Sequence, residues 1–233
     1  MKTNELILCS LKEYKTNELI FASKVYREKL SDKINETTYY KALERLCKNE
    51  YLANAAKGVY YIPQKSKYGI IPLSSRDIIS AFTKNGKGMV VGYSLYNQLQ
   101  LTTQVAKNVQ ILSSNLEGER KTVGNVIIRQ FQVEFSPEVE KTIQGLEVLQ
   151  NYFKIQDLNH KFFLKYTKIL AESYNEQVFM QAGLSKYYKK STIAFLREIL
   201  NFYNKKNNLE QFLSELSEYK YPRMEELRAI TQI

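Results

Sequence analysis

The chain has 233 residues, of which 44% are hydrophobic and 25% are charged, and its formal net charge is +10. This composition is typical of a globular protein with one large domain or two small ones. Cys9 and Cys47 are too few for a disulfide framework or a metal site, and we expect both to be buried, reduced thiols. No apolar run is long enough to span a membrane, and the first ten residues lack a signal peptide's apolar core. We therefore expect a soluble, cytoplasmic protein without a membrane partner.

The excess of basic side chains is densest at the start of the chain. Residues 1–67 hold 13 Lys and Arg against 8 Asp and Glu, residues 68–135 hold 7 against 4, and residues 136–233 hold 14 against 12. A module that binds a polyanion needs such a local excess, so the first 67 residues are the part where we look for one.

The hexapeptide KTNELI occurs twice, at Lys2–Ile7 and Lys15–Ile20. Apolar residues spaced by three and four positions predict a first helix around the first copy, whereas the second copy leads into a β-rich run at 19–23 that predicts a short strand. Ser23 is then the expected N-cap of a helix that continues to about Leu30.

Residues 35–63 carry the pattern of a helix followed by a β-hairpin. Apolar residues recur at helical spacing on one face of the predicted helix, at Ile34, Tyr39, Ala42, Leu43 and Leu46. The opposite face carries hydroxyls and charges, at Thr37, Thr38, Tyr40, Lys41, Glu44, Arg45 and Lys48. Tyr51-Leu52 and Val59–Ile62 have strand composition, with a turn expected at Asn54–Lys57 beside Gly58.

This layout is typical of a winged helix-turn-helix, whose second helix enters the DNA major groove. The alternative is a basic, solvated helix that happens to precede a hairpin. On the first interpretation Thr37 and Thr38 contact base edges, and Arg45 reads guanine, holds a phosphate or pairs with Glu44 or Glu50 at the surface; these three roles stay open. Lys57 is expected at the tip of the wing. The candidate DNA-binding residues are Thr37, Thr38, Tyr40, Lys41, Arg45, Lys48, Asn54 and Lys57.

The rest of the chain divides by its pattern into a mixed middle part and a helical end. A polar run with Pro63, Gly69 and Pro72 predicts a linker at about 64–74. Beyond it, helices are expected at 74–82 and 94–101, and strands at 89–92, 109–112 and 126–131. These elements predict a small α+β module at 68–135.

From Ser136 onward the pattern is helical. Ser136 is the expected N-cap of a helix with Pro137 at its first position. Asp157 is the expected cap of a helix whose apolar face holds Leu158, Phe162, Tyr166, Ile169 and Ser173. Further helices are predicted at about 191–204, at 208–219 and after Pro222. We expect these apolar faces to form a core, with a partner-binding groove as the alternative.

These patterns predict an α+β fold in three parts: a winged helix-turn-helix at 1–67, the small α+β module at 68–135 and a mostly helical region at 136–233. An enzyme is not expected. His160 is the only histidine, so no His-based triad or metal cluster can form with Cys9 or Cys47, and no Gly-rich phosphate loop is present. We expect no catalytic residue, metal or cofactor, and leave open a paired-carboxylate nuclease site built from residues remote in sequence.

Two segments together resemble the abortive-infection, AbiE-type antitoxins. The first is Lys41-Ala42-Leu43-x-Arg45-Leu46-x-Lys48, followed by Leu52 and by Lys57-Gly58-Val59-Tyr60-Tyr61-x-Pro63. The second is Leu99-Gln100-Leu101-Thr102-Thr103-Gln104-Val105, which resembles that family's Leu-Gly-Leu-Thr-Thr-Gln-Val. The resemblance covers about residues 15–135. The chain departs from it at Ala53 and Asn54, where relatives carry Arg in the wing, and at Gln100, which replaces Gly.

The resemblance implies a DNA-binding antitoxin of a type IV toxin–antitoxin system, acting in antiviral defence. Such a protein represses its own operon by binding inverted repeats in the promoter, where it can self-associate. It counteracts a nucleotidyltransferase-like toxin without necessarily binding it, and residues 68–233 can then be one antitoxin domain. Two alternatives stay open: an adaptor that sequesters a partner through its helical C-terminal half, and a stand-alone winged-helix transcription regulator.

Overall fold

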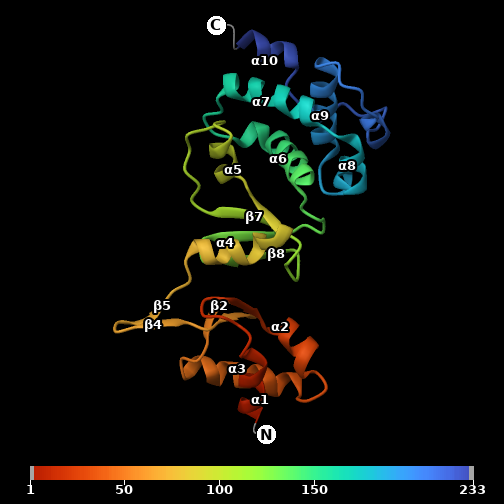
Figure 1. Ribbon diagram of the computed structural model, residues 1–233. Coiled ribbons are helices and arrows are strands. Elements are labelled where there is room, and N and C mark those ends of the chain that lie inside the picture. The colour runs from red at the N-terminus through yellow and green to blue at the C-terminus, as the bar shows by residue number, and fades with distance from the viewer. Residues whose placement is uncertain (1–2, 231–233) are drawn as a thin grey trace. The chain divides into compact units, whose positions relative to one another are not determined.

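The computed structural model describes residues 3–230 and confirms the α+β class, with a mostly helical C-terminal part (Figure 1). The chain divides into two compact units. The N-terminal unit is Met1–Ala81 with Thr122–Val126, and the C-terminal unit is Phe82–Lys121 with Ile127–Ile233. No helix in the described residues is both long and apolar enough to cross a lipid bilayer.

Up to Tyr61, the N-terminal unit combines α1, α2 and α3 with a three-stranded antiparallel sheet in the order β1-β3-β2. Helix α2 continues as a π-helical segment at Tyr26–Leu30. In chain order these elements are α1 (Thr3–Leu11), β1 (Leu19–Phe21), α2 (Ala22–Val25), α3 (Glu36–Lys48), β2 (Ala53–Ala56) and β3 (Val59–Tyr61). The predicted first helix, the strand in the second KTNELI copy and the helix after Asn35 are all confirmed.

The core of this unit is built on the apolar face of α3. Tyr39, Ala42, Leu43 and Leu46 are buried as predicted, against residues of α1, β1, α2 and β3. The buried Tyr39 hydroxyl donates a hydrogen bond to the main-chain oxygen of Ala22 at 3.1 Å, which ties α3 to the start of α2. Packing on this face therefore fixes which side of α3 is left for solvent.

The predicted turn at Asn54–Lys57 is wrong. Most of that segment is strand β2, and the chain reverses at Lys57-Gly58, where Gly58 has a φ of +73°. Ala53 lies opposite Tyr61, and a register shift between Asn54 and Ala56 marks a bulge. Pairing with the buried strand β3 outweighs the low strand propensity of Ala and Asn, which the sequence pattern could not show.

The predicted N-cap at Ser23 is also wrong. Helix α2 begins at Ala22, two residues earlier than a cap at Ser23 implies, with Phe21 at the N-cap and no side-chain cap. The N–H of Ala22 donates to the main-chain oxygen of Gly58 at 3.0 Å, so the hairpin between β2 and β3 supplies an acceptor at the start of the helix.

The segment predicted as a linker contains an antiparallel hairpin instead. Strands β4 (Gln64–Ser66) and β5 (Gly69–Ile71) pair with Ser66 opposite Gly69, so the predicted boundary after residue 67 falls at the hairpin's tip. Ser66 Oγ accepts from the N–H of Tyr68 at 3.2 Å and donates to the Gly69 oxygen at 3.1 Å. These bonds close a tight turn, whereas the polar composition of the segment had predicted only a linker.

A four-stranded sheet in the order β6-β7-β9-β8 is followed by a cluster of helices (Figure 1). Helices α6, α7 and α9 pack on one another, and α6 also contacts β6. These elements are preceded by α4 (Ser75–Thr83), which runs across the boundary between the two units. Their bounds are β6 (Gly88–Val91), α5 (Tyr93–Gln98), β7 (Val109–Ser113), β8 (Arg120–Val123), β9 (Val126–Gln130), α6 (Pro137–Asn151), α7 (His160–Ser173), α8 (Glu176–Gln181), α9 (Lys190–Phe202) and α10 (Met224–Ile230).

Of the two helix caps predicted in this unit, the cap of α6 is confirmed and the cap of α7 is wrong. Ser136 caps α6 as expected, accepting from the N–H of Val139 at 3.3 Å, with Pro137 as the first helical residue. Asp157 does not cap α7, because its backbone is left-handed, with a φ of +51°. Asn159 caps that helix instead, accepting from the N–H of Phe162 at 3.2 Å.

Two predictions about the C-terminal helices are wrong. The buried face of α7 is Phe163, Thr167, Leu170 and Ala171, one position away from the predicted stripe, and Ile169 is 59% exposed. The helix expected at 208–219 is only a 3-10 turn at Leu209–Phe212. Strand β8 and helix α8 were not predicted. The run of three polar residues in β8, Arg120-Lys121-Thr122, and the brevity of α8 left no periodic signal.

Candidate nucleic-acid interface

Helix α3 presents a polar stripe to solvent along its length. Its other face is held in the core, so the stripe's direction is fixed by packing. Positions three and four residues apart share one side of a helix, and on this side the exposed residues include Thr37, Thr38, Lys41, Arg45 and Lys48. We call these five residues the α3 stripe. They are five of the eight predicted DNA-binding residues, brought together on one element.

Asn35 fixes the start of α3. Its side-chain oxygen accepts a hydrogen bond from the N–H of Thr37 at 2.9 Å, which satisfies one of the free donors in the first turn. In a helix-turn-helix, the first residues of the second helix reach base edges. The cap therefore orders the turn that would have to make base contacts through Thr37 and Thr38.

The charge of the exposed α3 surface is mixed but mainly basic, with Lys41, Arg45 and Lys48 against Glu36 and Glu44. In the part of the chain that the structure describes, no salt bridge joins Arg45 to Glu44 or Glu50. Glu50 Oε2 instead lies 3.1 Å from Lys65 Nζ. The surface ion pair that was one of the expected roles of Arg45 is therefore not formed in the described residues.

Tyr40 lies at the border between the stripe and the core, not fully on the free face as predicted. It is half-buried, and its ring meets that of Tyr39 edge-on, with the centroids 5.3 Å apart. Burial raises the pKa of Tyr39 far above its ordinary value. Because Tyr40 is half-buried against Tyr39, much of its side chain contributes to packing, and only its exposed edge could contact a ligand.

Asn54 and Lys57 are exposed but belong to the β2–β3 hairpin, outside the α3 stripe. Asn54 lies opposite Tyr60 and forms a side-chain hydrogen bond with it. Burial, the largest effect, raises the pKa of the Tyr60 phenol, and the bond to Asn54 opposes that rise. Because the β2–β3 hairpin turns at Lys57-Gly58, it is short, and Lys57 is the cation at its tip.

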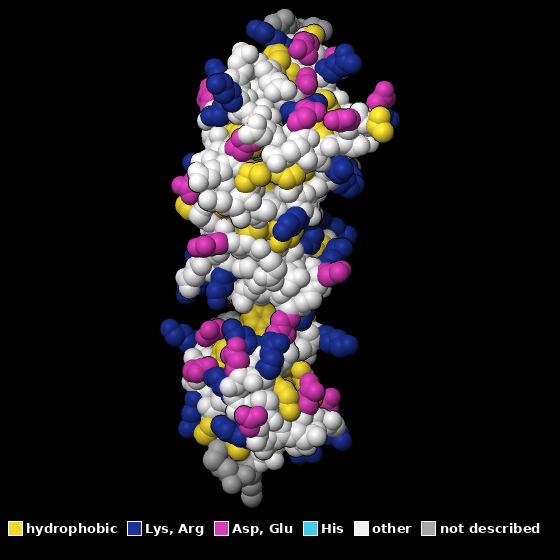
Figure 2. Space-filling view, turned by 90° about the vertical axis from the view of Figure 1, so that its right-hand side faces the viewer, with side chains coloured by type: hydrophobic (Ala, Val, Ile, Leu, Met, Phe, Trp, Pro, Cys, Tyr) yellow, Lys and Arg dark blue, Asp and Glu magenta, His cyan; other side chains and the backbone are white. Residues whose placement is uncertain are grey.

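The face of the N-terminal unit that Figure 2 shows has mixed charge. Figure 2 shows Lys and Arg side chains interspersed there with Asp and Glu, so neither sign forms a continuous patch. Mixed charge of this kind gives little net field at a polyanion.

The β4–β5 hairpin is an exposed feature that the linker interpretation missed. Tyr68, at its tip, is 88% exposed, and Lys67 Nζ lies 5.0 Å from the centre of the Tyr68 ring. The sequence signal that could have found it is the Gly69-Ile70-Ile71 run after a polar strand, which is compatible with a second hairpin.

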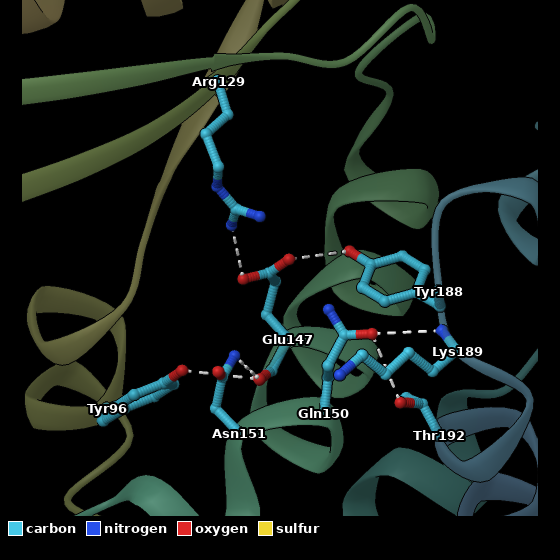
Figure 3. A network of polar contacts seen from close by, with 8 residues as sticks. All are labelled: Tyr96, Arg129, Glu147, Gln150, Asn151, Tyr188, Lys189 and Thr192. Carbon is cyan, nitrogen blue, oxygen red and sulfur yellow. Dashed lines mark hydrogen bonds and ion pairs between the residues drawn. The ribbon is translucent and has the colours of Figure 1, made fainter. Parts of the chain in front are cut away.

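The C-terminal unit contains a buried charged cluster centred on Glu147 of α6 (Figure 3). Glu147 is 2% exposed; one carboxylate oxygen lies 2.9 Å from an Arg129 guanidinium nitrogen, and the other accepts from the Tyr188 hydroxyl at 3.2 Å. The side chains of Asn151 and Tyr96 donate to the Glu147 main-chain oxygen, at 2.9 and 3.4 Å. Both carboxylate oxygens thus have a partner, as a buried charge requires.

The contacts of this cluster give it a structural role within the C-terminal unit. Burial, followed by the Glu147 carboxylate, raises the pKa of Tyr188 well above its ordinary value, so the hydroxyl remains a donor to that carboxylate. A hollow of about 520 Å³ in the same unit is lined by residues near the start of α6 and in α8, and Glu147 is not among them. The cluster joins β9, α6 and the segment before α9.

Among the described residues, no group of three or more His, Cys, Asp and Glu side chains could hold a metal ion. His160 is the first residue of α7. Cys9 is exposed, contrary to the expected burial, because it lies on the outer side of α1. Cys47 is half-buried, and burial raises the pKa of its thiol.

Comparison with known proteins places the chain in a family but does not assign it an activity. No protein with a curated description matches it. Residues 7–141 match the model of one sequence family. The matched range includes most of the N-terminal unit, the β4–β5 hairpin and the sheet of β6 to β9. The chain therefore belongs to DUF6088, a family of unknown function.

Proposed function

We propose that this protein is a sequence-specific DNA-binding regulator that inserts α3 into the major groove. The observation that carries the proposal is the α3 stripe: hydroxyls and cations lie along one side of a helix whose other side is fixed in a core of α1, α2 and β3. Cations and hydroxyls hold phosphates, while residues at the start of the helix read base edges. The order helix, strand, helix, helix and hairpin, with the sheet order β1-β3-β2, also suits a winged helix-turn-helix.

We extend this proposal to an antitoxin of a type IV toxin–antitoxin pair, on the resemblance to AbiE-type antitoxins. The backbone of Gln100 supports the equivalence of the second motif. Its φ is +58°, a left-handed conformation that Gly adopts most readily, and the resembled family carries Gly there. On this proposal the protein represses its own operon at inverted repeats, self-associates on that DNA and counteracts a nucleotidyltransferase-like toxin.

A fluorescence-anisotropy titration of the full chain tests DNA binding. The probes are the duplex upstream of its own gene and a scrambled duplex of equal length, each over a series of salt concentrations. Binding to the first duplex should be tighter, and its logarithm should fall linearly with the logarithm of salt. Equal, salt-insensitive or absent binding to both duplexes would contradict the proposal.

Substitutions in the α3 stripe locate the contact. Lys41→Ala should weaken binding to both duplexes and lower the salt slope by about 1 unit, as loss of a phosphate contact does. Arg45→Ala should cost about 1–3 kcal/mol and relax specificity at one operator position if Arg45 reads a base. Lys12→Ala is the matched control, because Lys12 is exposed and follows α1, which packs on the buried face of α3. Control-like binding by both stripe variants would remove α3 from the groove.

A partner-sequestering adaptor remains the second candidate, favoured by exposed apolar side chains in the C-terminal unit. Phe153 is 70% exposed and Ile169 of α7 is 59% exposed. Co-purification with the product of the neighbouring gene distinguishes the candidates. Stable co-purification that Ile169→Ser abolishes would favour sequestration, whereas rescue of toxin-inhibited growth that follows promoter occupancy would favour repression.

A further inference from the structure

The β4–β5 hairpin contributes almost nothing to the core of the N-terminal unit. All of β4 is exposed, as are Gly69 and Ile71, and only Ile70 is half-buried. An isolated two-stranded hairpin is at best marginally stable in water, so burial does not explain why the chain forms it here. A feature ordered without a core points to a role at the surface.

The tip of the hairpin is both cationic and aromatic. Residues 64–71 contain Lys65 and Lys67 and no acidic residue. Lys67 and Tyr68 are the two turn residues, and the bonds of Ser66 Oγ to the Tyr68 N–H and the Gly69 oxygen close this turn. In the part of the chain that the structure describes, Lys67 forms no salt bridge; its ammonium group lies over the Tyr68 ring. The tip thus offers an unneutralised charge beside a phenolic donor.

The base of the hairpin is tied to the end of α3. Lys65 Nζ lies 3.1 Å from Glu50 Oε2, two residues beyond the last residue of α3, and the N–H of Gln64 donates to Asn17 Oδ1 at 3.4 Å. Figure 1 shows the hairpin projecting away from the body of the unit. The three residues of each strand extend about 10 Å, which is comparable with the width of the major groove, about 12 Å. The arm is therefore long enough to reach the backbone beside a groove that α3 occupies.

We propose that this hairpin is a second DNA-binding arm, which contacts phosphates of the duplex next to the major-groove site of α3. The inference rests on the proposed function of α3. Lys67 places its ammonium group at a phosphate, and the Tyr68 hydroxyl donates to a phosphate oxygen, as Lys and Tyr do in protein–DNA contacts. Such contacts carry no sequence information, so the arm adds affinity and sets the position of α3 on the DNA.

The test uses the full chain with the two duplexes and salt series described above. Lys67→Ala should weaken binding to the promoter and the scrambled duplex by the same factor, roughly threefold to tenfold, and should lower the salt slope by about 1 unit. Tyr68→Phe should weaken both without changing the slope, because it removes a neutral donor. Lys12→Ala is again the control. Circular dichroism should be unchanged in all three, since the residues are exposed.

The outcomes separate this inference from the proposal on which it rests. In one outcome, the unsubstituted chain binds the promoter while Lys67→Ala and Tyr68→Phe match Lys12→Ala in affinity and salt slope. That result would overturn the proposed role of the hairpin and leave the proposed role of α3 standing. Loss confined to the promoter duplex would also overturn it, because phosphate contacts act on any sequence. Failure of the unsubstituted chain to bind either duplex would overturn the proposed function and the arm with it.

Discussion

At the scale of single residues, Gln100 has a left-handed backbone conformation that residues with a Cβ atom rarely adopt. Helix α5 ends with a bond from the N–H of Leu101 to the Tyr96 oxygen at 2.8 Å and another from Gln100 to Asn97 at 2.9 Å. This pattern places Gln100 just after the helix, in the left-handed position that Gly usually fills. A side chain with a Cβ is disfavoured there, so the site stores a small amount of strain.

Gln100→Gly should therefore stabilise the C-terminal unit. We expect a gain of roughly 0.5–1 kcal/mol, because relief of the left-handed strain exceeds the extra entropy that Gly loses on folding. Urea unfolding followed by circular dichroism measures it. Gln98→Gly, in the right-handed last position of the same helix, is the matched control and should lose up to about 1 kcal/mol. Destabilisation by both substitutions would mean that the Gln100 side chain stabilises the folded state by more than its left-handed backbone destabilises it.

At the scale of elements, the start of α3 depends on its cap. Asn35→Ala removes the acceptor for the N–H of Thr37 and should cost about 1 kcal/mol of unfolding free energy. Asn35→Ser keeps a side-chain acceptor at the same place and should lose much less. Amide hydrogen exchange at Thr37 gives a local readout, with faster exchange expected in Asn35→Ala alone. Equal exchange in the two variants would show that the cap does not order this turn.

Elements were predictable from the sequence where a strong periodic pattern and a strong cap coincided. Helix α3 was predicted because its buried and exposed faces alternate at helical spacing, and α6 because Ser136 and Pro137 mark its start. The α3 stripe followed from the same spacing. Strand β2, by contrast, depends on pairing with β3, and the face of α7 depends on which neighbours cover it. These are tertiary effects that leave no local signal. The β4–β5 hairpin was missed because a polar hairpin and a linker share one composition.

At the scale of the whole molecule, buried tyrosines set its response to alkali. Burial is the largest cause raising the pKa of Tyr39 in the N-terminal unit and of Tyr96, Tyr174 and Tyr188 in the C-terminal unit. In the unfolded chain these phenols titrate near 10. The folded state thus binds more protons at high pH. The stability contributed by these groups is complete below about pH 10 and is lost as the pH rises above it.

We therefore predict alkaline unfolding. By pH 11 each such phenol should have cost about 1.4 kcal/mol, so Tyr96, Tyr174 and Tyr188 together remove about 4 kcal/mol, a large share of a typical domain's stability. Urea unfolding at pH 8 to 11, with tyrosinate absorbance recorded in parallel, measures this. Tyr174→Phe is the sharpest control, because in the part of the chain that the structure describes its buried hydroxyl has no hydrogen-bond partner, so the variant should only flatten the pH dependence by one proton. If all 18 tyrosines ionised between pH 10 and 11 while the circular dichroism stayed native, burial would not be holding these phenols protonated.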